Sequence, residues 1–115
     1  MSKAWSDTDA YIAEHLVPAD AALAEALAAN EAAGLPPIDV SPPQGKFLHI
    51  LARLIGARRI LEIGTLGGYS TIWLARALPE GGQVITLEFS PHHAKTAEAK
   101  PALNRPDPAP VSGVV

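Results

Sequence analysis

Two acids and a group of glycines are the residues of this chain that most clearly could form a functional site. Glu62 lies inside the apolar run "RRILEI", the glycines of "GTLGG" follow it, and Glu88 lies twenty residues beyond Gly68. Glycines between a strand and a helix let a ligand approach backbone N–H groups, and an acid about twenty residues further on can accept hydrogen bonds from ribose hydroxyls. The spacing therefore predicts a site for a nucleotide-like ligand.

Two common types of glycine loop do not match this sequence. A dinucleotide fingerprint counted from Gly64 needs glycine at the positions of Leu66 and Tyr69, and "GYST" lacks the lysine of a phosphate-binding NTPase loop. A loop that lacks phosphate-binding chemistry but keeps a ribose acid predicts a nucleoside without phosphates, and S-adenosylmethionine is the common one. The positive charge on its sulfur suits neighbouring carboxylates. A nicotinamide-dependent oxidoreductase is disfavoured by the same mismatch.

The alternative is that the loop binds no ligand at all. In that case Gly64, Gly67 and Gly68 only make a tight turn, and Glu88 is a solvated strand end. Glu62 argues against this alternative, because a carboxylate within an apolar strand is costly to bury unless other groups donate hydrogen bonds to it.

The hydrophobic pattern predicts an α/β fold around this loop. Apolar periodicity, capping residues and glycine or proline boundaries predict helices over residues 7–17, 18–33, 42–55, 69–78 and 91–100, and buried strands over residues 58–63 and 83–88. A strand, a helix and a strand within about thirty residues form a βαβ unit with parallel strands. The final segment, "PALNRPDPAPVSGVV", shows neither the periodicity of a helix nor that of a strand. It predicts a proline-rich, unstructured tail over residues 101–115.

Composition narrows the class of protein further. A chain of 115 residues forms one small domain, and its net charge of −3 without a basic patch gives no footprint for a nucleic-acid partner. The absence of cysteine excludes disulfides and thiolate metal sites. No apolar run approaches the roughly 18 residues of a membrane span, and the start lacks a signal-peptide pattern, so we expect a cytoplasmic protein without a membrane partner.

Two motifs and the acid after the second strand together resemble a known family. The motifs are "P-x-x-G-x-F-L", formed by Pro42, Gly45, Phe47 and Leu48, and "LEIGT-x-x-GYS-T". With them the chain resembles the cofactor-binding half of the cation-dependent O-methyltransferases, which include caffeoyl-CoA and catechol O-methyltransferases. The resemblance extends roughly from Trp5 to Lys100 and is strongest from Val40 to Glu88. It implies the N-terminal part of a Rossmann-like class I methyltransferase fold and methyl transfer from S-adenosylmethionine to a catechol-like hydroxyl of a small-molecule acceptor.

The resemblance also implies which residues contact the cofactor. Val40 would offer its backbone to the methionine end, Tyr69 and Ser70 would close over the carboxylate end, and Glu88 would accept the ribose hydroxyls. The full set of implied cofactor residues is Val40, Glu62, Gly64, Thr65, Gly68, Tyr69, Ser70 and Glu88. Many members carry aspartate at the ribose position, so the glutamate is a mild departure.

The same family holds a divalent cation such as Mg²⁺ with acids and an amide from later strands. Those strands are expected after Lys100 and do not follow there in this sequence, so no metal ligand and no catalytic residue is assigned. His92 and His93 are interpreted as a solvated helix face, because adjacent helical residues point about 100° apart. We therefore expect residues 1–100 to be a partial, truncated cofactor-binding domain with little or no turnover.

The alternative function is a non-catalytic fragment that holds the cofactor or pairs with a relative through its N-terminal helices. Because this family commonly dimerises, Trp5 and the first helix are the candidate homodimer contact.

Overall fold

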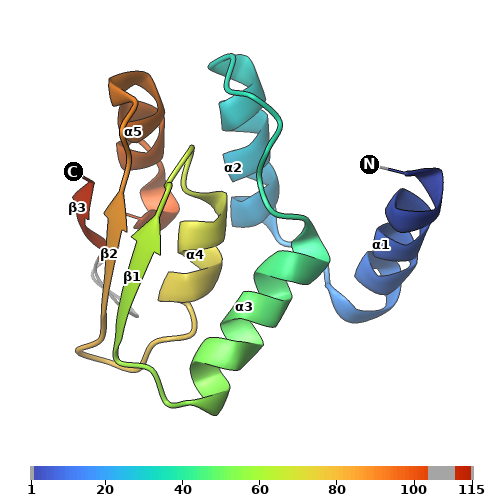
Figure 1. The fold of residues 1–115 in the computed structure, drawn as a ribbon, viewed down its shortest axis with the longest axis horizontal. Helices are drawn as coiled ribbons and strands as arrows, with labels where there is room; N and C mark the ends of the chain where they lie inside the picture. Colours follow the sequence, from blue (N-terminus) through green and yellow to red (C-terminus); the bar gives the residue numbers. More distant parts are fainter. Residues whose placement is uncertain (1, 104–110, 115) are drawn as a thin grey trace.

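The computed structural model describes residues 2–103 and 111–114, which form an α/β fold around one parallel sheet (Figure 1). The elements in chain order are α1 (Lys3–Leu16), α2 (Ala21–Ala32), α3 (Pro42–Leu54), β1 (Arg59–Ile63), α4 (Tyr69–Ala75), β2 (Gln83–Leu87), α5 (Pro91–Glu98), a 3-10 turn η1 (Pro101–Leu103) and β3 (Val111–Val114). The strand order is β1-β2-β3, and both pairings are parallel. The predicted α/β fold with a parallel βαβ unit is confirmed.

Side-chain caps decide where the first three helices begin. Helix α3 starts as predicted, with Ser41 and Gln44 bonded to each other's backbone N–H groups in a capping box. Helix α2 starts after Asp20, whose Oδ1 accepts from Leu23 N at 3.0 Å, and so begins later than predicted. Helix α1 starts earlier than predicted, because Ser2 caps it.

Helix α4 packs against the sheet on one side and against α2 on the other (Figure 1). The β1–β2 register places Ile60 beside Val84 and Glu62 beside Thr86, and these residues face α4. Two buried apolar clusters result. The first comprises Leu23, Ala26, Tyr69, Ile72, Ala97 and Leu103, and the second comprises Leu74, Ala75, Leu78 and Val84.

The opposite face of β1 is exposed. Leu61 and Ile63 are 62% and 81% accessible to solvent, and we call these two side chains the open sheet face. The prediction that this strand is buried is therefore wrong for one of its faces. A short apolar run predicts a strand with two covered faces, but it does not show whether a second layer is present.

The last part of the chain also differs from its prediction as an unstructured tail. Pro101–Leu103 form a 3-10 turn with Leu103 buried in the first cluster, and Val111–Val114 extend the sheet beside β2. Residues 104–110 and 115 lie outside the described residues. The expectation that no strand follows Lys100 is corrected by β3. Leu103 packs into a core and β3 pairs with the free edge of β2, and local periodicity in the sequence reveals neither interaction.

Candidate functional site

The glycine loop, residues 64–68, connects the tip of β1 to α4 (Figure 1). Gly64 and Gly68 have φ angles of 93° and 91°, and Leu66 also has a positive φ of 52°. Gly64 N donates to Leu87 O at 2.8 Å and Gly68 N donates to Thr65 O at 2.9 Å. A Cβ added to Gly64 would meet nothing within 4 Å, so the space above this glycine is open to a ligand.

Glu62 is held by three hydroxyl groups. Its Oε1 accepts from Thr71 Oγ1 at 2.5 Å and from Thr86 Oγ1 at 2.8 Å, and its Oε2 accepts from Ser70 Oγ at 2.7 Å. These donors come from the first turn of α4 and from β2, so the carboxylate ties the helix start to both strands. A carboxylate offers about four acceptor positions, so these bonds largely satisfy it.

Thr65 and Tyr69 point their side chains away from the open space above the loop. Both are 2% exposed. Thr65 Oγ1 lies 2.5 Å from Thr86 Oγ1, and the Tyr69 ring belongs to the first apolar cluster, where burial raises the pKa of its hydroxyl. Any contact of these two residues with a ligand in the loop is therefore restricted to their backbones.

Glu88 lies against the glycine loop. Its Oε1 accepts from Leu66 N at 2.6 Å, its Oε2 accepts from Ser90 N at 3.1 Å, and His93 Nδ1 lies 3.8 Å from Oε2. Burial raises the pKa of this carboxyl, but the backbone N–H groups of Ser90, Leu66 and Phe89, together with His93, outweigh burial and hold the pKa below its ordinary value of 4.5. The structure thus brings an ionised acid from the end of β2 into the loop that follows β1.

Sequence reasoning missed a polar cluster beside the loop, in which Asn30 and Lys100 are buried and Asp39 is half-buried. Asn30 of α2, Asp39 of the connection before α3, and Lys100 after α5 are joined by hydrogen bonds. Val40, next to Asp39, is half-buried and packs against the first apolar cluster. The one sequence signal is a single asparagine in an otherwise alanine-rich helix, and it does not indicate the partners.

The described residues do not fit a divalent cation. Among residues 2–103 and 111–114, no group of three or more histidine, aspartate or glutamate side chains is arranged to hold a metal ion. The two adjacent histidines have different neighbours, because His92 Nε2 lies 2.8 Å from Ala33 O and His93 lies beside Glu88. Within the same residues, none of the helices combines the length and apolar character that a membrane span requires.

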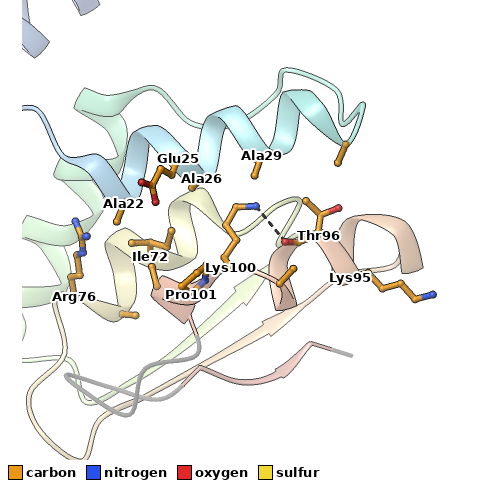
Figure 2. A pocket seen from close by; sticks show the side chains of 14 residues that line it. Ala22, Glu25, Ala26, Ala29, Ile72, Arg76, Lys95, Thr96, Lys100 and Pro101 are labelled. Carbon is orange, nitrogen blue, oxygen red and sulfur yellow. Dashed lines mark hydrogen bonds between the residues drawn. The ribbon is translucent and has the colours of Figure 1, made fainter.

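A cavity of about 620 Å³ lies away from the loop, between α2 and the segment from α5 to η1 (Figure 2). Alanines dominate its lining, and no residue of the glycine loop contributes to it. Of its polar side chains, Arg76 is paired with Asp20 at 2.8 Å and Lys100 donates to Asn30 at 2.7 Å. Because these two side chains already have partners and the glycine loop does not line the cavity, we place the candidate site at the glycine loop.

The parallel βαβ unit, the open glycine loop and the acid after the second strand define a Rossmann-like cofactor-binding fold. The sequence profile of the O-methyltransferase family matches residues 13–106. The chain belongs to the O-methyltransferase family.

Similar proteins give the same assignment. The chain is 60% identical over 91 residues to a catechol O-methyltransferase of Mycobacterium tuberculosis and 53% identical over 94 residues to one of Niastella koreensis. These matches cover 79% and 82% of this chain but 41% and 42% of the relatives, so the chain spans about two fifths of their length. The crystal structure of the O-methyltransferase from Bacillus cereus in complex with SAH is 51% identical with a TM-score of 0.89, covering 100% of this chain and 53% of that one.

Proposed function

We propose that this chain is the cofactor-binding part of a cytoplasmic O-methyltransferase that uses S-adenosylmethionine. This cofactor carries a methyl group on a positively charged sulfur, and transfer to an acceptor hydroxyl forms an O–CH₃ bond, breaks the S–CH₃ bond and releases the hydroxyl proton. The proposed acceptor is a small molecule with a catechol-like hydroxyl, in line with the names of the two curated relatives.

The observation that carries this proposal is the contact between Glu88 and the glycine loop. A carboxylate that is ionised at neutral pH and lies 2.6 Å from Leu66 N is well suited to accept ribose hydroxyls beside the loop. The open space above Gly64 supports the same proposal, since its lack of a side chain lets a nucleoside approach the backbone.

The proposed cofactor residues divide into three groups by what they offer. Glu88 offers a carboxylate for the ribose, and Glu62 holds Ser70 in place through a hydrogen bond of 2.7 Å. Val40, Gly64, Thr65, Gly68, Tyr69 and Ser70 would offer backbone groups, because the Ser70 hydroxyl already donates its hydrogen to Glu62 Oε2.

The divalent cation of the resembled family finds no set of ligands among the described residues. Because a catechol needs its hydroxyl activated, we propose that this chain by itself turns over a catechol slowly or not at all.

Calorimetric titration of the purified chain with S-adenosylmethionine, SAH and NAD⁺ tests the proposal. We expect S-adenosylmethionine and SAH to bind and NAD⁺ to bind more weakly; tighter binding of NAD⁺ would overturn the proposal. Glu88→Ala should weaken binding of S-adenosylmethionine by about 1–3 kcal/mol, because hydrogen-bonding groups lose their acceptor. Glu80→Ala, in the exposed turn before β2, is the matched control and should leave the affinity unchanged.

A second candidate function is a binding unit that pairs with a copy of itself through α1. None of the residues of α1 is buried, and Trp5, Tyr11 and Leu16 are 69%, 65% and 59% exposed. Light scattering coupled to size-exclusion chromatography tests this candidate. A dimer that becomes a monomer in the Trp5→Ser variant would support it, and a monomeric chain at all concentrations would exclude it.

A further inference from the structure

Asn30 is a buried side chain to which the proposed function gives no role. It lies in α2, far from the loop in sequence, and is 3% exposed. Its Nδ2 donates to Asp39 Oδ1 at 3.0 Å, and its Oδ1 accepts from Lys100 Nζ at 2.7 Å. A carboxylate can only accept and an ammonium can only donate, so the amide fits between them in one orientation.

The glycine loop rests directly on this amide. A Cβ built on Gly67 would collide with Oδ1, Cγ and Nδ2 of Asn30, so only glycine allows the backbone to come this close. Gly67 does not have a positive φ, in contrast to its neighbour Gly68, so the close approach and not the backbone conformation requires a glycine here.

The two charged partners connect Asn30 to two further segments. Asp39 directly precedes Val40, which the proposed function places at the methionine end of the cofactor. Lys100 is 4% exposed, and its Nζ also donates to Thr96 O at 3.3 Å (Figure 2). One amide therefore joins the loop, the connection before α3 and the C-terminal end of α5.

We propose that Asn30 is a positioning residue for the cofactor site, whose buried amide fixes the Gly67 turn and the Asp39–Val40 segment relative to each other. This inference rests on the proposed function, because the proposed function places both Val40 and the glycine loop at one cofactor. Asn30 is 3% exposed and lies directly against Gly67, so the role that we assign to it is to hold the loop and not to contact the ligand. Its effect is preorganisation, which lowers the cost of ordering the site when the ligand binds.

An exchange of the side chains of Asn30 and Asp39 tests the inference. Asn30→Asp puts two carboxylates opposite each other and removes the donor to residue 39. The double variant Asn30→Asp with Asp39→Asn restores a donor and an acceptor of the same size with the same total charge. We expect Asn30→Asp to weaken SAH binding about tenfold or more, and the double variant to return to within about threefold of the wild type.

A ligand-free measurement separates this inference from the proposed function. Hydrogen exchange of the Gly68 amide, which donates to Thr65 O, reports on the loop itself. We expect its protection to fall in Asn30→Asp and to recover in the double variant. Leu78→Val in the second apolar cluster is the control, and should lower the melting temperature without changing either the affinity or the exchange of Gly68.

The outcomes are distinct. If the folded Asn30→Asp variant binds SAH as tightly as the wild type, or keeps the full protection of Gly68, the positioning role is wrong. If the wild type binds no SAH while Gly68 is protected, the proposed cofactor is wrong and the inference fails with it. Should Asn30→Asp not fold, Asp39→Ala at a half-buried position removes the same hydrogen bond and is expected to give the same losses.

Discussion

Glu62 and Leu61 are neighbours on β1 but belong to regions with opposite properties. Glu62 is one of two acids at the loop end of the sheet that are held by several hydrogen bonds. Leu61 and Ile63 point to the opposite side and are 62% and 81% exposed. The alternation of a strand therefore places an organised polar site and a bare apolar surface on one five-residue element.

This difference shows that the site and the open sheet face depend on different interactions. The groups that hold Glu62 and Glu88 come from the loop, β2 and the starts of α4 and α5, all on the covered side or at the strand ends. The open sheet face contributes nothing to them. A parallel sheet is normally covered on both faces, so this surface is where the described residues depart most from a typical α/β protein.

The largest expected effect comes from matched truncations on the two sides of the fold. Ile72 is 1% exposed in the first apolar cluster, whereas Ile63 is 81% exposed. Ile72→Ala should lower the free energy of unfolding by about 2–5 kcal/mol, and Ile63→Ala by less than about 0.5 kcal/mol. Urea denaturation measures both. Similar losses in the two variants would mean that the open sheet face is covered in solution.

A smaller effect on the free energy of unfolding is expected for the carboxylate of Glu62. Glu62→Gln replaces one acceptor by an amide donor facing hydroxyl donors, and should cost about 1–3 kcal/mol of unfolding free energy. The control is Glu80→Gln in an exposed turn, for which we expect no measurable change. Equal urea midpoints for the two variants would contradict the role of Glu62 in tying α4 to the strands.

The pH dependence of stability should reveal the contribution of the ionised Glu88 carboxylate to the folded state. Its pKa in the folded chain lies below the ordinary 4.5, so its contribution is fully present above about pH 4.5 and is lost as the pH falls through the lower folded-state pKa. The difference in melting temperature between the wild type and Glu88→Gln should therefore shrink as the pH falls below about 4.5. A difference that grows as the pH falls below about 4.5 would contradict the sign of this pKa shift.

The smallest effect on stability is expected at the open sheet face itself. The Leu61→Thr, Ile63→Thr double variant keeps β-branched or strand-compatible residues at exposed positions, so its melting temperature should stay within about 2 °C of the wild type. Binding of the dye 8-anilinonaphthalene-1-sulfonate should fall, because the apolar surface is smaller. Unchanged dye fluorescence would show that the dye binds elsewhere, for example in the alanine-lined cavity.

Much of the fold was readable from local patterns, and the failures have a common cause. Ser41, Pro42 and the apolar stripe that follows predict α3, and the two apolar runs predict parallel strands joined by α4. By contrast, whether Leu61 is covered or exposed, and whether β3 pairs with β2, depend on segments that are distant in the sequence. No local period reports on these interactions.

The candidate site shows the same division. The spacing of Glu62, the glycines and Glu88 predicts that an acid and a loop come together, and the structure brings them together. The sequence could not show that the side chains of Thr65 and Tyr69 point into the protein, because their direction depends on packing. Nor could it reveal Asn30, whose partners lie nine and seventy positions away.

The hydroxyl groups of Thr65 and Thr86 form a chain of hydrogen bonds that ends at Glu62, and each bond in the chain has a fixed donor and acceptor. Glu62 can only accept, so the single hydrogen of Thr86 is directed at it, and Thr65 must then supply the hydrogen between the two threonines. Thr65 is left with lone pairs alone and can only accept from any further neighbour. An acid on β1 thereby determines the hydrogen-bonding polarity of a loop residue three positions later through an intermediary on another strand.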